Sequence, residues 1–540
     1  MAYNIGDLFE YTVDAVPDRT ALIDGPLHLS FAELDRRSNL VANALIDSGV
    51  LPGEHVGIYA QNSHEWIEVM LGAFKARAIP ININFRYVAD ELSYLLGNAD
   101  CVVCVADRTY LPLLDAVSDR TPTLRSIWWI DDGSDAPTKV GDLPVDSFDD
   151  LASAASPDRP RLDRSPDDLY VLYTGGTTGL PKGVMWRQED VFMALGQGID
   201  SVTGEQVAND HGLAEKAASF DTPMIFLVIP PLMHGAAQWG TMGQMFQGHT
   251  IALLPKFSAA GVWELVESEG VHSMLITGDA MGRPMIEHLA EDPGRYDTSS
   301  VISVSSSAAI FSPTVKDRFI DVFPNLIITD SIGSSESGFN GLRMVSKGDT
   351  QMRGGGPTVT PGPDVVLLDE DLQIIPPGSD TVGKMGRGGN IPLGYYKDET
   401  KTAATFVTAA DGRRYAVSGD FAQWEDDGTI TLLGRGSTTI NSGGEKIHPE
   451  EVEQALKDHP AVFDCIVVGV PDERWGQTVA AVVQFREGVT AELESLAEHA
   501  RTFVAGYKVP RELHVVDEIR RSPSGKPDYP WASALAKGDR

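Results

Sequence analysis

Cysteine is rare in this chain, and no long apolar run occurs in it. Three cysteines among 540 residues are too few for the disulfide framework that stabilises a small secreted domain. No segment approaches the roughly 20 consecutive apolar residues that an α-helix needs to cross a bilayer. Residues 1–10 include acidic side chains and lack the basic and apolar parts of a secretion signal. We therefore expect a soluble, cytoplasmic protein without a transmembrane segment.

Basic residues are scarce as well. Lysine and arginine number 43 against 77 aspartates and glutamates, and the formal net charge at pH 7 is −34. Because nucleic-acid binding depends on basic surfaces, this balance argues against a nucleic-acid partner. A polyanionic small molecule would need a locally positive site, and the basic side chains grouped in residues 501–526 offer one. A solvated basic face is the alternative for each of them except Lys526.

The C-x-x-C pair of Cys101 and Cys104 raises the question of metal or redox chemistry. Both residues lie in an apolar run that is typical of a buried strand, and positions i and i+3 of a strand face opposite sides. No second Cys or His pair with ligand spacing is visible. We expect two structural thiols.

A segment rich in hydrogen-bond donors begins at Tyr173 and reads Tyr-Thr-Gly-Gly-Thr-Thr-Gly-Leu-Pro-Lys-Gly. Its glycines let backbone N–H groups approach a ligand, and its threonines and Lys182 add further donors, which suits a polyphosphate. It is not a Walker loop, because Pro181 stands where the helix would start and no Gly-Lys-Ser/Thr follows. An ordinary mobile turn is the alternative, but the attached Pro-Lys-Gly favours a phosphate loop between strands at 169–173 and 183–186.

Hydrophobic periodicity predicts an α/β fold. Over the first 430 residues, β-rich runs alternate with amphipathic helical stretches, which indicates layered, mainly parallel sheets. The clearest strands are 56–59, 78–83 and 101–105, with helices at 65–75 and 89–96. Near residues 354–357 the pattern changes to short strands and turns, consistent with a β-barrel-like subdomain. With 42% hydrophobic residues the chain can bury a large core divided among more than one domain.

A second, smaller α+β domain is predicted after residues 434–435. Residues 449–458 and 493–503 have helical periodicity, whereas 465–470 and 479–485 read as strands. We therefore divide the chain into domains 1–434 and 435–540.

The phosphate loop and eight further motifs, found in the expected order, resemble those of the adenylate-forming superfamily, which includes acyl-CoA synthetases, luciferases and peptide-synthetase adenylation domains. The eight further motifs occupy residues 29–34, 74–86, 230–234, 331–336, 415–420, 434–435, 443–447 and 522–526. Residues 173–179, 330–336 and 440–446 are most similar to actinobacterial fatty-acid and steroid-side-chain CoA ligases. The resemblance implies a mobile C-terminal domain with its hinge near Ser437, where many relatives have Asp or Lys.

The resemblance also implies a two-step reaction with ATP, Mg²⁺ and CoA. A carboxylate attacks the α-phosphorus of ATP to give an acyl adenylate and pyrophosphate, and the CoA thiol then displaces AMP. Such chemistry requires positioning and charge neutralisation more than a protein nucleophile. The expected product is the CoA thioester of a bulky apolar acid, either a steroid side-chain acid or a fatty acid.

Nucleotide-binding residues follow from the matched motifs. Those expected to hold the β- and γ-phosphates are Thr174, Gly175, Gly176, Thr177, Thr178, Gly179 and Lys182. Those expected around the adenine and along the adjoining motif are Ser307, Ala308, Ala309, Asp330, Ser331, Ile332, Gly333 and Ser335. Asp420 should accept hydrogen bonds from the ribose hydroxyls, and Arg435 should donate to the ribose or a phosphate. Two positions depart from the family pattern: Gly176 replaces a serine and Ile332 replaces an aromatic residue.

Three residues are implied in catalysis. Lys526 should bridge the attacking carboxylate and the α-phosphate as charge develops. Glu336, with Thr178 as a second ligand, should hold Mg²⁺, because hard oxygen ligands suit that ion. His234 should gate the passage between the acyl pocket and the pantetheine tunnel, although a structural hydrogen bond is an open alternative. The loop of Gly443, Gly444 and Lys446 should serve the second half-reaction.

The acyl pocket should lie between His234 and Asp279. Its expected residues are Gly235, Ala236, Trp239, Gly240, Thr277 and Gly278. Such small side chains suggest a broad cavity for a bulky tail, steroid or linear. The rival functions are an acyl-AMP ligase that loads a carrier protein and a non-catalytic nucleotide-binding relative. The sequence gives no oligomeric state.

Overall fold

The structure is a computed structural model, and it describes residues 3–174, 180–195, 207, 209–345, 357–435, 438–442, 445–472, 476–522 and 525–538. For residues 435, 441, 445, 446 and 476 only the backbone is described. The chain forms two compact units. The first contains Met1–Ile276, His288–Ser303 and Asn390–Ala404, and the second contains Thr277–Glu287, Val304–Gly389 and Thr405–Arg540.

The first unit contains a parallel sheet in the order β4-β3-β5-β6-β7. Its strands are β3 (His55–Tyr59), β4 (Ile79–Asn82), β5 (Cys101–Asp107), β6 (Ser126–Ile130) and β7 (Val145–Ser147). These strands confirm the three predicted ones. Every residue of β3, β4 and β5 is buried, so both faces of these strands are covered, and their sequences are mainly apolar.

A second set of parallel strands in this unit has the order β12-β10-β11-β1, with β2 antiparallel at its edge. Its strands are β1 (Thr20–Asp24), β2 (Leu27–Ser30), β10 (Ile225–Val228), β11 (Thr250–Leu253) and β12 (Ser273–Ile276). A third sheet pairs β8 (Leu169–Thr174), β9 (Lys182–Arg187) and β20 (Gly394–Tyr395) antiparallel. The strands β8 and β9 are those predicted on either side of the phosphate loop.

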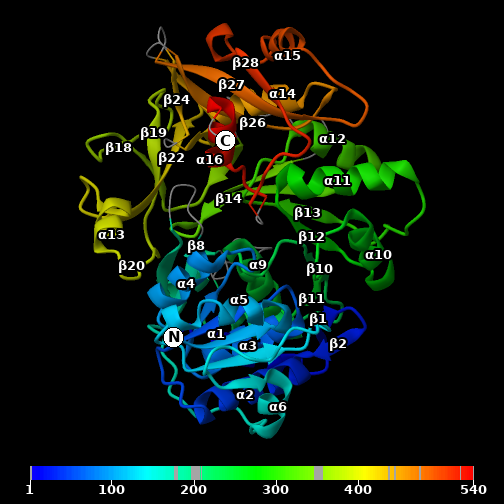
Figure 1. The fold of residues 1–540 in the computed structure, drawn as a ribbon, viewed down its shortest axis with the longest axis vertical. Helices are drawn as coiled ribbons and strands as arrows, with labels where there is room; N and C mark the ends of the chain where they lie inside the picture. The colour runs from blue at the N-terminus through cyan, green and yellow to red at the C-terminus, as the bar shows by residue number, and fades with distance from the viewer. Residues whose placement is uncertain are drawn as a thin grey trace. The chain divides into compact units, whose positions relative to one another are not determined.

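Helices of the first unit cover these sheets, and α2 and α6 lie side by side at the lower end of the ribbon (Figure 1). They are α1 (Ile5–Ala15), α2 (Phe31–Asp47), α3 (His64–Lys75), α4 (Ala89–Asn98), α5 (Leu111–Asp115), α6 (Phe148–Ala154), α7 (Gln188–Ala194), α8 (Gly212–Ala218), α9 (Gly235–Phe246), α10 (Ala259–Glu269) and α13 (Glu399–Thr405). Ser30 and Ser63 accept hydrogen bonds from backbone amides of the first turns of α2 and α3, and this capping fixes where both helices begin.

Antiparallel strands form the main sheet of the second unit, in the order β14-β15-β16-β23-β22-β19-β17-β18. The strands here are β13 (Ser303–Ser306), β14 (Ile327–Ser334), β15 (Gly338–Val345), β16 (Thr358–Pro361), β17 (Val365–Leu368), β18 (Ile374–Ile375), β19 (Gly383–Arg387), β21 (Phe406–Thr408), β22 (Arg414–Trp424) and β23 (Ile430–Arg435), and the helices are α11 (Gly278–Glu291) and α12 (Pro313–Val322). The predicted change to short strands is confirmed. The hydrogen-bonded order of the described strands ends at β18 and does not close into a barrel.

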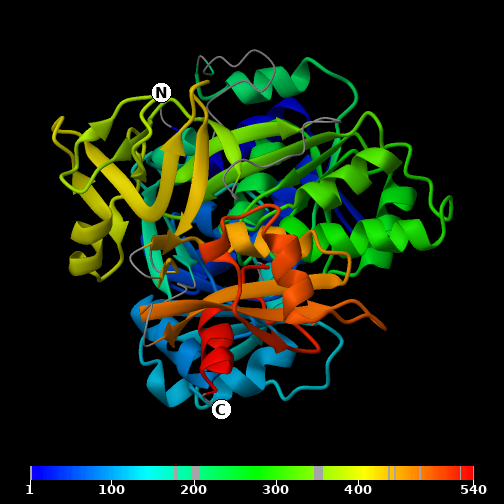
Figure 2. The same cartoon turned by 90° about the horizontal axis from the view of Figure 1, so that it is seen from above.

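The last hundred residues contain their own sheet, in the order β25-β24-β27-β26, with β28 parallel to β27. The elements are β24 (Ile440–Ser442), β25 (Glu445–Ile447), α14 (Pro449–Lys457), β26 (Val462–Asp472), β27 (Gly476–Phe485), α15 (Leu493–Ala500), β28 (Glu512–Val515) and α16 (Tyr529–Lys537). One face of β26 and β27 packs against α14 and α15, and the other face packs against α16 (Figure 2). The predicted helices and strands of this region are confirmed, with α15 ending three residues before Phe503.

The prediction for Cys101 and Cys104 is partly wrong. Both are buried and free, and burial raises the pKa of the Cys104 thiol to about 12. However, a β-bulge skips Val102 in the pairing of β3 with β5. As a result, the two thiols lie on the same side, each near the position that a Cβ at Gly57 would take.

None of the described helices is long and apolar enough to cross a membrane.

Candidate active site

Lys182 is the first residue of β9, and it lies opposite Thr174, the last residue of β8. The loop residues Gly175, Gly176, Thr177, Thr178 and Gly179 lie outside the described residues. The ammonium of Lys182 is 2.9 Å from Asp398 Oδ2 and lies 5.6 Å from the centre of the Tyr395 ring. Hydrogen bonding to Lys182 lowers the pKa of Asp398. In this arrangement a carboxylate neutralises the predicted phosphate-binding lysine.

The segment before His234 is joined to the start of the phosphate loop by Asn82, at the end of β4. The Asn82 amide donates to the Tyr173 carbonyl at 2.8 Å and to the Met233 carbonyl at 2.6 Å, and its oxygen accepts the Tyr173 N–H at 2.8 Å. Asn82 is buried, so these bonds are shielded from water. A single side chain thus positions the backbone on which two predicted motifs depend.

The predicted acyl-pocket residues of the first unit lie on the first turns of α9, which His234 precedes directly. A Cβ at Gly235 would lie 2.5 Å from Leu172 Cδ2, and one at Gly240 would lie 3.3 Å from Leu275 Cδ2. A side chain at position 235 would therefore displace Leu172, whereas one at position 240 would require only a small shift of Leu275. The Trp239 indole N–H donates to the Tyr170 hydroxyl at 3.1 Å, which fixes that ring. A role in acyl binding stays a prediction for these residues and for Ala236.

In the second unit, the predicted adenine wall follows β13 directly. Ala308 has a φ of +66°, which is uncommon for a residue with a Cβ. The Ala309 N–H donates to the Ser307 carbonyl at 2.8 Å, which closes this tight turn. Backbone strain of this kind persists where surrounding structure enforces it, and it clusters at functional sites.

Thr277 and Gly278 lie next to this turn. The Gly278 N–H donates to Ser306 Oγ at 3.1 Å, and the Ser331 hydroxyl donates to the Ser306 carbonyl at 3.2 Å. Gly278 has a φ of +52°, and a Cβ there would lie 2.2 Å from the Ile310 carbonyl oxygen, so only glycine fits. The structure therefore brings together three segments that the sequence assigned to the nucleotide and the acyl group.

Strands β14 and β15 are joined by a tight turn that carries Ser335 and Glu336. The Ser337 N–H donates to Ser334 Oγ at 3.2 Å, and the Asn340 amide donates to Ser337 Oγ at 2.8 Å. A Cβ at Gly333 would lie 2.3 Å from the Gly338 carbonyl oxygen, so glycine is required next to the register shift between Ile332 and Gly333. The turn holds the half-buried Glu336 at the end of the hairpin.

Asp330 and Ile332 on β14 have protein partners in this structure. The Asp330 carboxylate is buried and forms an ion pair with Lys316. Burial raises the pKa of Asp330, although the Lys316 charge opposes that change. Ile332 packs against the apolar core that includes Leu367 and Ile430. Nucleotide binding by both residues remains a prediction.

Asp420 and Arg435 are cross-strand partners on β22 and β23. The Ser418 hydroxyl donates to Asp420 Oδ2 at 2.8 Å. Only the backbone of Arg435 is described, so the register alone supports the expectation that these two residues serve one ligand.

Lys526 lies on a loop of the second unit that also contains Gly525. Gly525 has a φ of +74°, and a Cβ there would lie 3.0 Å from Thr277 Oγ1 and 3.2 Å from Ala280 Cβ. The loop therefore lies against the start of α11, beside Gly278. The predicted catalytic lysine and two predicted substrate residues are neighbours in the structure.

The described parts of this region fit a polar ligand. Ser307 Oγ and Thr277 Oγ1 are buried, and neither has a hydrogen-bond partner among the described residues. A buried hydroxyl without a partner is costly, and such groups occur where a ligand or water supplies the missing bond. Residues Gly443, Gly444 and Ser437 and the Lys446 side chain lie outside the described residues, as does the second predicted magnesium ligand, Thr178.

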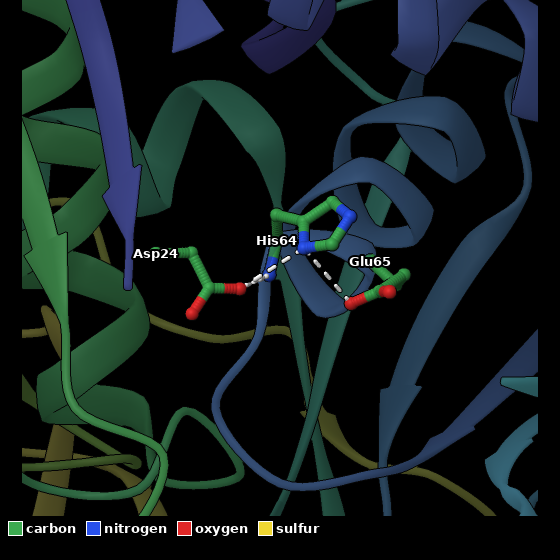
Figure 3. Close-up of side chains that lie close together, drawn as sticks. All are labelled: Asp24, His64 and Glu65. Atoms are coloured by element: carbon green, nitrogen blue, oxygen red, sulfur yellow. Dashed lines mark hydrogen bonds and ion pairs between the residues drawn. The ribbon is translucent and has the colours of Figure 1, made fainter. Parts of the chain in front are cut away.

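A further cluster of potential metal ligands lies at the start of α3. His64 Nδ1 is 2.9 Å from Asp24 Oδ2 and 3.2 Å from Glu65 Oε2 (Figure 3). Asp24 Oδ2 also accepts the His64 backbone N–H at 2.9 Å. Because the imidazole and this amide both approach one carboxylate oxygen, we interpret the cluster as an ion pair that caps α3.

Three polar residues that contact predicted site segments received no individual role from the sequence, although Arg521 was included in the basic group of residues 501–526. They are Asn82, Lys316 and Arg521, whose guanidinium is bound to the Gly525 carbonyl at 2.8 Å. Asn82 lies inside one recognised motif and Arg521 directly precedes another, so proximity to a motif was the available signal. Lys316 lies in no recognised motif, and its pairing with Asp330 can be seen only in the folded structure.

Comparison with known proteins covers nearly the whole chain. The family model for AMP-binding enzymes matches residues 9–396, and the model for the AMP-binding enzyme C-terminal domain matches residues 451–526. A 3-oxocholest-4-en-26-oate–CoA ligase of Rhodococcus rhodochrous is 49% identical over 537 residues, covering 98% of this chain and 96% of that protein. A medium/long-chain-fatty-acid–CoA/3-oxocholest-4-en-26-oate–CoA ligase of Mycolicibacterium smegmatis is 50% identical over 541 residues, covering 99% and 97%.

Solved structures share the fold at lower identity. The anthranilate CoA ligase AuaEII in complex with anthranoyl-AMP has a TM-score of 0.84 at 22% identity, covering 99% of this chain and 98% of that one. ATP-bound MatB from Rhodopseudomonas palustris has a TM-score of 0.81 at 22% identity, covering 99% of both chains.

Proposed function

Since this chain belongs to the AMP-binding enzyme family, we propose that it is an acyl-CoA ligase that converts a bulky apolar carboxylic acid to its CoA thioester through an acyl adenylate. The observation that carries this proposal is the identity of about half of all residues, over almost the entire chain, to ligases named for steroid side-chain and fatty acids. A cytoplasmic location and the domain boundary after residue 434 belong to the same proposal.

In the first half-reaction, Lys182 and the donors of the phosphate loop hold the β- and γ-phosphates. Lys526 approaches the attacking carboxylate and the α-phosphate, and its charge offsets the negative charge that develops there. Ser307 and Thr277 donate hydrogen bonds from their hydroxyls to the bound ligand. Neither hydroxyl has a hydrogen-bond partner among the described residues, which supports this role. Glu336, with Thr178, would hold Mg²⁺, which neutralises phosphate charge when bound.

In the second half-reaction, the loop of Gly443, Gly444 and Lys446 replaces Lys526 at the site, and His234 opens the passage for the pantetheine arm. The C-terminal region has two apolar cores of its own, one on each face of its sheet. A region with its own core can move as a body without losing its fold, which supports the proposed rotation about Ser437.

A coupled assay of AMP formation tests the proposal, with a steroid side-chain acid and linear fatty acids compared at equal concentrations. We expect acid-dependent AMP and pyrophosphate in equal amounts and a CoA thioester as the product. Adenylate that accumulates regardless of added CoA would instead favour a ligase that loads a carrier protein. Absence of pyrophosphate with every acid would contradict an enzymatic role.

A further inference from the structure

The loop that carries Lys526 is held by a buried ion-pair network. Arg521 Nε is 2.6 Å from Asp464 Oδ2, and Nη2 is 2.7 Å from Asp464 Oδ1, a two-point contact between two side chains that are only 14% and 15% exposed. Lys457 supplies a second cation, 3.2 Å from Asp464 Oδ1. Burial alone would raise the pKa of Asp464, but the charges of Lys457 and Arg521 outweigh it and hold that pKa well below its usual range.

The third guanidinium nitrogen of Arg521 contacts the loop that carries Lys526. Its Nη1 donates to the Gly525 carbonyl at 2.8 Å. The N–H of the same peptide unit, which belongs to Lys526, donates to Ser522 Oγ at 3.1 Å. The Ser522 N–H in turn donates to the Lys526 carbonyl at 2.8 Å. Both ends of the Gly525–Lys526 peptide are therefore fixed, and with them the orientation of the Lys526 backbone.

This arrangement needs arginine rather than another cation. A guanidinium presents a planar fork of donors, so it can bind both oxygens of a carboxylate and still donate a further bond, whereas an ammonium is a single point charge. A second buried carboxylate, Glu453, also interacts with the charges of Lys457 and Arg521, so charge balance accounts for a cation at position 521. It does not account for a guanidinium, whereas the bond to the Gly525 carbonyl does.

We propose that Arg521, anchored by Asp464, is a positioning residue for Lys526 in the first half-reaction. Asp464 lies on β26, so its ion pair with Arg521 connects the loop that carries Lys526 to the C-terminal sheet. The loop lies against the start of α11, where Gly525 meets Thr277 and Ala280. This inference rests on the proposed function, in which Lys526 serves adenylation and leaves the site before CoA reacts.

The test measures the two half-reactions separately in the full-length protein. Adenylation is followed by acid-dependent exchange of labelled pyrophosphate into ATP, and thioester formation is followed with a supplied medium-chain fatty acyl adenylate and CoA. We expect Arg521→Ala to lower the adenylation rate roughly 10²-fold, because misplacement of a reacting group by about 1 Å has that cost. The KM for ATP and the rate of thioester formation should change by no more than about twofold. Arg521→Lys should give an intermediate adenylation rate.

Three further variants make the result decisive. Lys537→Ala removes an exposed cation of the same region and should alter neither half-reaction. Ser522→Ala keeps the ion pairs but removes the acceptor of the Lys526 N–H, so it should lower adenylation alone, roughly 10-fold. Lys526→Ala should abolish adenylation and leave thioester formation intact.

Two outcomes would overturn the inference: equal loss of both half-reactions in folded Arg521→Ala and Ser522→Ala, or unchanged adenylation in both. If Lys526→Ala abolishes adenylation in the same experiment, only the positioning role fails. If Lys526→Ala keeps full adenylation, the proposed role of Lys526 fails instead.

Discussion

At the scale of single residues, Asn82 shows how one buried amide can position two functional segments. Replacing it with leucine leaves the Tyr173 N–H and the carbonyls of Tyr173 and Met233 without their present partner. An unsatisfied buried polar group costs about 1–3 kcal/mol. We therefore expect Asn82→Leu to lower the free energy of unfolding by roughly 2–4 kcal/mol in urea titrations.

Asn84 provides the matched control for that experiment. It belongs to the same motif, but its side chain accepts only the Arg86 N–H in an exposed turn. Asn84→Ala should change stability by less than about 0.5 kcal/mol. Equal effects of the two substitutions would show that the bonds of Asn82 do not hold these segments.

Asp398 and Lys182 form a second residue-scale contact with a measurable consequence. Both side chains are about one-third exposed (32% each), and such a pair is worth about 0–1 kcal/mol. If Lys182 binds ATP phosphates, it must leave Asp398 first. Asp398→Asn keeps an acceptor for the Lys401 N–H and removes the competing charge, so the KM for ATP should fall by up to about fivefold.

Glu399→Gln, at the neighbouring exposed position, controls for the loss of one negative charge and should leave that KM unchanged. A higher KM in Asp398→Asn would mean that the carboxylate orients Lys182 for ATP instead of competing with it.

At the scale of elements, the start of α3 makes stability depend on pH. Burial disfavours the charged His64 imidazole, but its hydrogen bond to Asp24 and the charges of Glu65, Glu68 and Asp24 outweigh burial and raise its pKa. Burial also raises the pKa of Glu68 to about 7, with the charges of His64 and Arg37 opposing the change. Both groups therefore bind protons more tightly in the folded protein than in the unfolded chain.

The direction of this pH dependence follows from the linkage between proton binding and folding. The His64 contribution is complete below its unfolded pKa and is lost as the pH rises through its folded pKa, while ionisation of Glu68 becomes a penalty as the pH rises from about 4.5 towards 7. The joint contribution of His64 and Glu68 to stability should therefore fall between pH 5 and pH 8, with a Glu68 share on the order of 3 kcal/mol. Glu68→Gln should reduce this slope in urea titrations across that range, and an unchanged slope would contradict the assignment.

Elements also show where sequence reasoning succeeds and where it stops. The strands β3 and β5 and the helix α3 could be predicted because their apolar periodicity is local. The bulge at Val102 could not, because register depends on the neighbouring strand. Gly235 suggested an open pocket in the sequence, whereas the structure shows close contact with Leu172, a long-range fact that composition does not encode.

The same limit applies to the site. Lys526 and Glu336 were predicted from motifs, which are contiguous and therefore readable. Arg521 was predicted only as one member of a basic group, because its contact with Asp464, which lies 57 residues away in the chain, is not visible in the sequence. Buried polar groups acquire their meaning from the partners that the fold supplies.

At the scale of the whole molecule, membership of the AMP-binding enzyme family implies that one chain catalyses two successive reactions of the same acid. The C-terminal region has an apolar core on each face of its sheet, which is compatible with the proposed exchange of loops between the two reactions. Two successive reactions require that the acyl adenylate form on the enzyme before CoA reacts with it.

Rapid-quench analysis of the wild-type protein tests that requirement directly. With acid, ATP and Mg²⁺ but no CoA, we expect about one equivalent of pyrophosphate and enzyme-bound acyl adenylate per protein chain, and subsequent addition of CoA should convert the adenylate to thioester and AMP. Formation of ADP and phosphate, or thioester that appears without any prior adenylate, would contradict the account.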